Sequence, residues 1–276
     1  MKIGFIDYYL DEWHANNYPK MIKELSDGRY EVSFAYGKTD SPIGGMTSKE
    51  WAEKNGIELL GSIEEVIEKS DRLIVLSPDN PEMHEELCEL PLKSGKLLYI
   101  DKTFAPDRKA AERIFESAKA GNTKCYSSSA LRFASELKDI DKKTIHKIYS
   151  EGPGEYEMYS IHQIEPIIYL MESRAKQVMF TGESNHPSMI IRFEDGRYAQ
   201  MYQTRNTPFR LTVEKEDSSS DIMQIKSNYF GLFLEELIRF FDTGIVPVPC
   251  EQTIDVIAVR EAGLKAMKTP YEWVEV

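Results

Sequence analysis

The sequence is poor in cysteine and has no excess of basic residues. Its three cysteines are widely spaced over 276 residues and form no Cys-x-x-Cys pair, so the sequence predicts neither a zinc site nor a disulfide framework. Lys and Arg number 34 against 46 Asp and Glu, which gives a net charge of -12. Because DNA, RNA and anionic membranes bind clustered positive charge, we expect no nucleic-acid partner and no membrane contact. Since no Cys or His residues stand at ligand spacing, we also expect no bound metal.

Long apolar runs and a signal-like N-terminus are also missing. No stretch approaches the roughly 20 apolar residues that cross a bilayer, and the first residues, MKIGFID, lack a basic segment followed by an apolar one. We therefore expect a cytoplasmic protein. A hydrophobic content of 41% over 276 residues suffices for a sizeable core, and two domains of ordinary size are expected at this length.

Short apolar segments alternate with helical patterns in the first part of the chain. Strands rich in β-branched or aromatic residues are expected at residues 2–7, 30–36, 72–76, 96–100 and 124–128. Helices are expected at residues 13–25, 48–54, 62–69 and 107–120. This alternation is typical of β-α-β units, so residues 1–122 are predicted to form a Rossmann-type domain with a doubly wound parallel sheet.

After residue 122 the apolar segments become longer and alternate with polar residues. Strands are expected at residues 146–150, 177–182, 188–193, 197–204 and 209–215. Helices are expected at residues 164–171, 229–242 and 251–268. Residues 123–276 are therefore predicted to form an α+β domain with an open, mainly antiparallel sheet. Because an apolar sheet face needs cover, we expect a homo-oligomer, either a dimer or a tetramer.

Three short segments resemble a known family. The segments are LYIDKTFA at residues 98–105, SSALRF at residues 128–133 and YSIHQIE at residues 159–165. In this order they are similar to the Glu-Lys-Pro segment, the Arg that opens the second domain and the His-x-x-Asp helix start of the glucose-fructose oxidoreductase / inositol dehydrogenase superfamily. The resemblance implies NAD- or NADP-dependent oxidation or reduction of a sugar, cyclitol or related hydroxylated compound.

The resemblance also implies which residues carry the reaction. Lys102 and His162 match the family's Lys and His on either side of the transferred hydride, and we expect them to face one another where the two domains meet. His162 would take the hydroxyl proton while Lys102 orients the oxygen. Glu165, three residues after His162, matches the second acidic position and is the third catalytic candidate. Arg132 and Tyr159 are the expected substrate-binding residues.

The sequence departs from the family at the loop after the first strand. The dinucleotide fingerprint G-x-G-x-x-G lets a pyrophosphate approach the backbone at a helix N-terminus. Here the three glycine positions hold Asp7, Tyr9 and Glu12, which add bulk and negative charge. Thr103 also replaces the Pro after the family's Lys, and Met158 stands where the family has an Asp four residues before its His.

These departures leave alternatives open. If a dinucleotide binds, its expected contacts are Asp7, Tyr9, Ser77, Pro78, Asn80 and Lys102. The other hypothesis is a non-redox relative, a sensor or pseudoenzyme that keeps a ligand cleft without standard dinucleotide binding. Two candidate residues also have alternative roles. Arg132 could tie the two domains together, and Glu165 could have a structural role, because acids are favoured near helix N-termini. His14 and His84 are expected on helices of the first domain, with no partner for metal binding.

Overall fold

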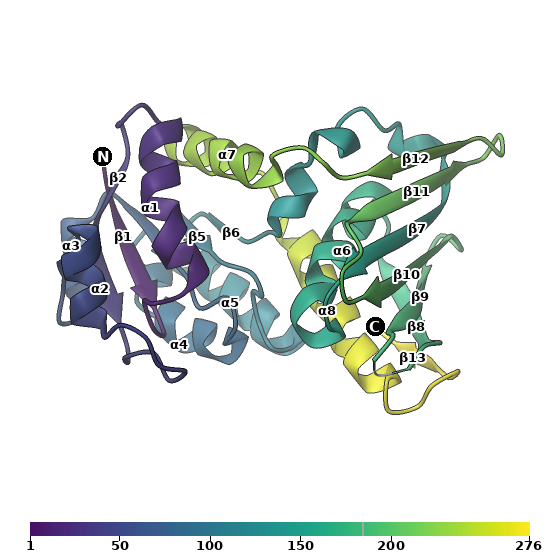
Figure 1. The fold of residues 1–276 in the computed structure, drawn as a ribbon, viewed down its shortest axis with the longest axis horizontal. Helices are drawn as coiled ribbons and strands as arrows, with labels where there is room; N and C mark the ends of the chain where they lie inside the picture. Colours follow the sequence, from purple (N-terminus) through teal and green to yellow (C-terminus); the bar gives the residue numbers. More distant parts are fainter. Residues whose placement is uncertain (184) are drawn as a thin grey trace. The chain divides into compact units, whose positions relative to one another are not determined.

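The computed structural model describes residues 1–183 and 185–276, and the chain folds into two compact units. The first unit holds residues 1–128 and 234–250, and the second holds residues 129–233 and 251–276. Figure 1 draws both units with their elements labelled. The sequence pattern assigns residues 234–250 to the second domain, whereas in the fold they pack with the first unit. Within the described residues, no helix is long and apolar enough to cross a membrane.

The first unit is built on a six-stranded parallel sheet with the order β3-β2-β1-β4-β5-β6. Its strands are β1 (Lys2–Asp7), β2 (Glu31–Gly37), β3 (Glu58–Leu59), β4 (Arg72–Val75), β5 (Leu98–Ile100) and β6 (Cys125–Tyr126). Because the chain winds outward in both directions from β1, the strand order reverses between β1 and β4. Open α/β sheets bind ligands beyond the carboxyl ends of the strands at such a point. The prediction of a doubly wound parallel sheet is confirmed.

Local sequence signals explain where the helices of this unit begin. The helices are α1 (Trp13–Leu25), α2 (Ser48–Asn55), α3 (Ile63–Lys69), α4 (His84–Cys88) and α5 (Arg108–Ala120). Ser62 Oγ accepts a hydrogen bond from Glu65 N (3.3 Å) at the start of α3, and Asp107 Oδ1 accepts one from Ala110 N (2.8 Å) at the start of α5. Such side chains satisfy backbone donors that have no partner inside a helix.

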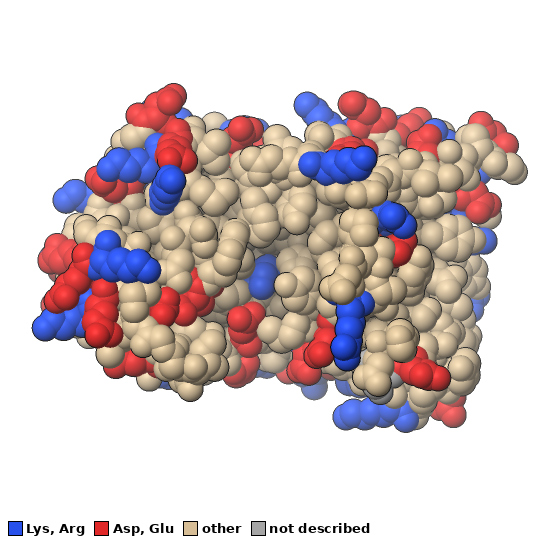
Figure 2. All heavy atoms as spheres, viewed as in Figure 1, with Lys and Arg blue, Asp and Glu red and all other residues tan. Residues whose placement is uncertain are grey.

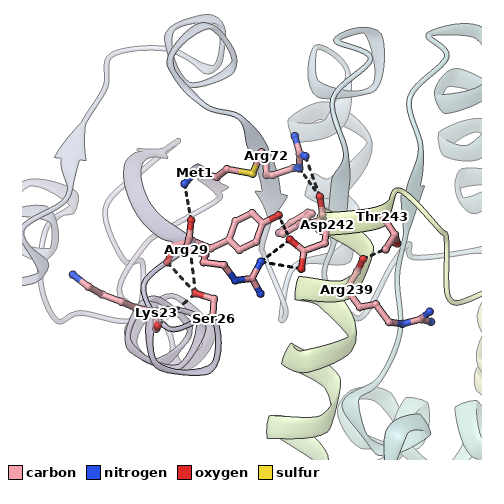
Figure 3. A network of polar contacts seen from close by, with 10 residues as sticks. Met1, Lys23, Ser26, Arg29, Arg72, Arg239, Asp242 and Thr243 are labelled. Atoms are coloured by element: carbon pink, nitrogen blue, oxygen red, sulfur yellow. Dashed lines mark hydrogen bonds and ion pairs between the residues drawn. The ribbon is translucent and has the colours of Figure 1, made fainter.

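Residues 234–250 are attached to the first unit by the end of α7 (Tyr229–Thr243). Asp242 accepts two hydrogen bonds from the Arg29 guanidinium, at 2.8 and 3.0 Å, and one from Tyr30 Oη at 2.8 Å. Arg72 donates from Nε and Nη2 to the backbone carbonyl of Phe241. Figure 3 shows Arg29 and Arg72 reaching this helix end. Side-chain hydrogen bonds, together with the contact between the Tyr30 and Phe241 rings, therefore hold the end of α7 on the first unit.

The second unit is built on a seven-stranded sheet with the order β12-β11-β7-β10-β9-β8-β13. Its strands are β7 (Ile145–Pro153), β8 (Ala175–Phe180), β9 (Ser188–Phe193), β10 (Tyr198–Thr204), β11 (Arg210–Lys215), β12 (Ser220–Gln224) and β13 (Trp273–Glu275). The pairing of β7 with β10 is parallel and the other pairings are antiparallel. The prediction of an open, mainly antiparallel sheet is confirmed. Strands β12 and β13 lie outside the expected set.

Helix α6 (Tyr156–Met171) packs on one face of this sheet, against β7 and β10. The helix starts eight residues before the expected start at residue 164. A buried amide joins helix and sheet, since Gln163 accepts from Ser150 Oγ (2.8 Å) and donates to the carbonyl of Tyr202 (3.3 Å). Helix α8 (Cys250–Ala266), in which ten of 17 residues are buried, is a further helix of the same unit.

The opposite face of the second sheet mixes aromatic and polar side chains. Tyr149 and Tyr202 are partly exposed there, and Tyr149 pairs with Gln200 on β10 and Thr212 on β11. This face is less apolar than the argument for a homo-oligomer assumes, so the dimer or tetramer stays a prediction. Figure 2 shows Lys and Arg interspersed with Asp and Glu over the described residues of the face drawn, rather than gathered into one broad positive surface.

Candidate active site

The loop between β1 and α1 is closed by its own side chains. Glu12 is the N-cap of α1, and its carboxylate accepts hydrogen bonds from His14 N (2.7 Å) and Ala15 N. These two N–H groups have no acceptor within the helix, so they are the donors that a helix N-terminus usually offers to an anion. Tyr9, at the second glycine position of the fingerprint, is buried. The positions that glycine would leave bare are therefore filled.

Asp7, the last residue of β1, is a buried acid beside this loop. Its side chain is almost inaccessible, at 1% exposure, and Oδ2 has no hydrogen-bond partner among the described residues. Burial raises the pKa of Asp7 well above its ordinary value, and the nearby Glu12 and Asp101 carboxylates raise it further. Burial and these two carboxylates therefore drive Asp7 toward its neutral form.

Glu12 is also perturbed. Its side chain is 8% exposed, and burial raises its pKa to about 7 even though the neighbouring His14 and the backbone donor of Ala15 act to lower it. Removing a carboxylate from water disfavours the charged form, while an adjacent cation and hydrogen-bond donors favour it. Glu12 therefore changes charge near neutral pH.

The end of β5 completes this group of buried ionisable residues. Asp101, directly after β5, is in contact with His14 Nδ1 through Oδ2, and its Oδ1 lies 3.0 Å from Tyr99 Oη. Burial raises the pKa of Asp101, but the attraction of His14, its hydrogen bond and the charge of Lys102 outweigh that effect and hold the pKa below its ordinary value. No local sequence pattern indicates the His14–Asp101 contact, because 87 positions separate the two residues.

The remaining expected cofactor contacts lie at the ends of β4 and β5. Ser77 and Pro78 are buried just beyond β4, and Ser77 Oγ donates to the carbonyl of Asn80 (3.1 Å). Thr103 N donates to the carbonyl of Pro78 (3.4 Å), which joins the two loops. Lys102 follows Asp101 and is half-buried. Because β1, β4 and β5 are adjacent and parallel, these residues and Asp7 share the carboxyl edge of one sheet.

His84 proves to be a structural residue of this unit. Its Nδ1 lies 3.0 Å from the carbonyl of Phe104, and its Nε2 contacts the carbonyl of Leu76. Burial lowers the pKa of His84. His14 and His84 are thus both buried and bonded within the fold, rather than placed on helix surfaces. No set of three or more His, Cys, Asp or Glu side chains among the described residues is arranged to hold a metal ion.

In the second unit, His162 lies within α6 and not at its start. Its Nδ1 is 2.7 Å from Ser129 Oγ, within hydrogen-bonding distance. The rings of Tyr159 and Phe209 meet it edge-on, with centroids 5.5 and 6.0 Å away. Tyr159 is 45% exposed, so a ligand has access to its ring. The expectation of a helix start at His162 is wrong because Tyr156 begins the helix six residues earlier.

Arg132 and Glu165 form a buried ion pair in the same unit. Arg132 Nη1 donates to Glu165 Oε1 at 3.0 Å, Nη2 donates to Gln252 Oε1, and the guanidinium lies 4.5 Å from the centroid of the Tyr169 ring. Both charged side chains are at most 5% exposed. This geometry favours a structural role for the pair over direct substrate contact. Glu165 is not the helix-start acid that the sequence suggested, because it lies in the third turn of α6.

His162 and Glu165 nevertheless share one face of α6, as their three-residue spacing predicts. Both contact the short segment that carries Ser129 and Arg132. A cavity of about 460 Å³ lies elsewhere in the unit, lined by residues that include His146, and none of the candidate residues lines it. The candidate residues of the second unit therefore form one cluster between the middle of α6 and the segment at residues 129–133.

Comparisons with known proteins support the fold. No protein-family model and no curated protein matches the sequence. Among solved structures, a probable dehydrogenase from Thermotoga maritima matches with a TM-score of 0.77 and 16% identity, over 100% of this chain and 98% of that one. UDP-N-acetylglucosamine 3-dehydrogenase from Acidithiobacillus ferrooxidans matches with a TM-score of 0.79 and 12% identity, over 98% of each chain.

A third solved structure contains ligands. Scyllo-inositol dehydrogenase from Lactobacillus casei, with bound cofactor NAD(H) and scyllo-inositol, matches with a TM-score of 0.78 and 14% identity, over 99% of this chain and 98% of that one. The TM-scores of 0.77 to 0.79 over the whole length establish the fold, and identities this low establish the fold alone. The chain therefore shares the fold of these dehydrogenases over its full length, in agreement with the fold that the resemblance of its three segments implies.

Proposed function

We propose that this chain is an oxidoreductase that acts on a hydroxylated small molecule such as a sugar or cyclitol, with NAD or NADP as its cofactor. The observation that carries the proposal is the position of Lys102, two residues beyond the end of β5 at the carboxyl edge of a doubly wound sheet. Open α/β sheets bind their ligands at that edge. The dehydrogenase fold over the full chain and the NAD(H) complex among its structural neighbours support the proposal.

The fit of the cofactor differs between two parts of this edge. At the start of α1 the residues do not fit a pyrophosphate, because Glu12 already accepts hydrogen bonds from the N–H groups of His14 and Ala15. At the ends of β4 and β5 the acids already have partners, since Glu82 Oε1 accepts from the Asn80 amide (3.0 Å) and Asp101 contacts His14. Lys102 adds a cation there. A bound nicotinamide would supply hydride transfer. We therefore assign its contacts to the ends of β4 and β5.

The residues of the chain itself would handle the substrate hydroxyl. Under this proposal Lys102 donates a hydrogen bond to the substrate oxygen and favours the negative charge that develops there. His162, held at Nδ1 by Ser129 Oγ, exchanges a proton with the hydroxyl through Nε2. Arg132 and Glu165 act as positioning residues, because their ion pair fixes α6, which carries His162, against the segment at residues 129–133.

The test is turnover on a panel of sugars and cyclitols with NAD(H) and NADP(H). We expect Lys102→Ala and His162→Gln each to lower kcat by a factor of about 10² to 10⁴, the usual contribution of a positioned acid or base. Matched controls are Lys109→Ala and His146→Gln, which change exposed residues of the same types and should keep full activity. Unchanged kcat in either active-site variant, or no turnover with any panel member, would contradict the proposal.

A second function is favoured by the closed loop at α1. If Glu12 and Tyr9 exclude the cofactor altogether, the chain is a non-redox relative that binds a hydroxylated ligand as a sensor or pseudoenzyme. Calorimetric titration separates the two functions. An oxidoreductase binds NAD(H) or NADP(H), whereas the non-redox relative binds a panel sugar or cyclitol and neither dinucleotide.

A further inference from the structure

The start of α1 decides where a dinucleotide can lie in the first unit. In doubly wound sheets the pyrophosphate accepts hydrogen bonds from free N–H groups at the N-terminus of the helix after the first strand. Here those donors, His14 N and Ala15 N, are bonded to the two carboxylate oxygens of Glu12. The chain thus supplies its own anion where the fold usually receives one from a ligand.

The backbone and a neighbouring acid hold Glu12 in that position. Glu12 N donates to the carbonyl of Leu10 (2.9 Å), and the Glu12 carbonyl accepts from Asn16 N (3.0 Å) as the first turn of α1 closes. The adjacent Asp11 accepts from Met46 N (2.8 Å) and from the Asn16 amide (3.0 Å). The loop is therefore tied on both sides, and Glu12 is a built part of the helix start rather than a mobile surface acid.

The surroundings of Glu12 also oppose a second anion. Asp7 and Asp101 lie near enough to act electrostatically on the Glu12 group, and Asp101 is already paired with the one buried histidine of the cluster, His14. Tyr9 fills the volume that the second glycine of the fingerprint leaves open. A pyrophosphate at this point would meet both like charge and bulk.

We propose that Glu12 is a resident anion that excludes a dinucleotide pyrophosphate from the N-terminus of α1. The proposal deepens the proposed function and rests on it, because it concerns how the same sheet edge receives the cofactor. Under it, any bound dinucleotide keeps its diphosphate away from His14 N and Ala15 N, and loss of the Glu12 carboxylate exposes a diphosphate site that the backbone already contains.

The experiment compares the parent protein with Glu12→Ser by calorimetric titration with ADP-ribose at pH 8. ADP-ribose carries the same diphosphate diester as the dinucleotides and has no nicotinamide, so the result is independent of redox activity. Ser keeps a hydrogen-bonding cap for the helix while it removes the charge and most of the side-chain length. We expect at least about tenfold tighter binding by the variant, equivalent to about 1.4 kcal/mol.

Two further variants keep the test decisive. Glu24→Ser makes the same change in an exposed residue at the other end of α1 and should leave affinity unchanged. Glu12→Gln preserves the shape of the side chain and removes only its charge, so a smaller gain is expected, and it replaces Glu12→Ser if that variant does not fold. Equal affinity of parent and variant, no binding by either, or a crystal structure of the parent with the diphosphate on His14 N would overturn the proposal.

Failure of this inference is distinguishable from failure of the proposed function. If the parent turns over a panel substrate with NAD(H) but Glu12→Ser binds ADP-ribose no better, the function stands and the role of Glu12 falls. If Glu12→Ser gains affinity while the parent binds no dinucleotide and has no turnover, the role of Glu12 stands and the chain is the non-redox relative.

Discussion

The two units each bury a group of ionisable side chains, but the groups differ in charge balance. In the second unit Arg132 and Glu165 pair one cation with one anion, and Gln252 satisfies a further guanidinium donor. In the first unit three buried acids, Asp7, Glu12 and Asp101, act electrostatically on one another, and His14 contacts Asp101. Burying charge is costly unless it is paired. The Arg132–Glu165 pair, whose charges balance, therefore fits a structural role. The acid-rich group instead carries strongly perturbed pKa values, as functional sites often do.

The largest stability effect is expected from breaking the balanced pair. Glu165→Ala leaves the Arg132 guanidinium buried without its carboxylate, which typically costs about 3 to 5 kcal/mol. The measurement is urea unfolding followed by far-UV circular dichroism and tryptophan fluorescence. Glu157→Ala is the matched control, since it makes the same change on an exposed face of the same helix and should cost a few tenths of a kcal/mol. Similar losses in both variants would mean that the pair contributes nothing beyond the helix surface.

An effect of opposite sign, smaller for each pH unit, is expected in the acid-rich group. Because the pKa of Asp7 is raised in the folded protein by burial and by Glu12 and Asp101, the folded chain holds a proton that the unfolded chain releases. Its contribution is fully present below the ordinary Asp pKa and is lost as pH rises toward the folded pKa. Asp7→Asn removes this loss, so the variant should become more stable than the parent by at most about 1.4 kcal/mol per pH unit.

Urea unfolding of the parent and Asp7→Asn at several values from pH 5 to pH 8 measures that difference. Asp139→Asn, a change of an exposed aspartate, is the control and should follow the parent at every pH. A gap between Asp7→Asn and the parent that stays constant or narrows with rising pH would show that Asp7 is ionised in the folded state. The contrast between the two buried groups would then disappear.

Most of the fold could be predicted from the sequence because its signals are local. Runs such as Arg72–Val75 are short, mostly apolar and flanked by helical patterns, and Ser62 and Asp107 mark the starts of α3 and α5. The sequence pattern does not mark the start of α6, because the first turns of this helix mix the buried Tyr156 with exposed polar and aromatic residues. Pro166 points to a later start, since proline suits the first turn of a helix. In the structure it lies in the interior of α6.

The candidate site was predictable only where a residue's position in an element decides its role. Lys102 lies at the end of a strand, so its place at the sheet edge follows from the strand itself. The contact of His14 with Asp101 and that of Arg132 with Glu165 join residues 87 and 33 positions apart, and no local pattern reports such contacts. The sequence placed the charge of Glu12 correctly in the loop, but its hydrogen bonds to the helix start depend on backbone geometry that only the fold provides.

The smallest expected effect comes from the polar contacts that attach the end of α7 to the first unit, where Tyr30 is buried but its partner Asp242 is partly exposed to solvent. Tyr30→Phe removes one hydrogen bond, from Tyr30 Oη to Asp242, and keeps the ring against Phe241. Arg29 still pairs with Asp242 in the variant, and water can replace the lost donor. We expect a loss of about 0.5 to 1.5 kcal/mol, measured by urea unfolding beside Glu165→Ala. A loss as large as that of Glu165→Ala would mean that the return of α7 to the first unit depends on this contact, and that burial does not set the order of the effects.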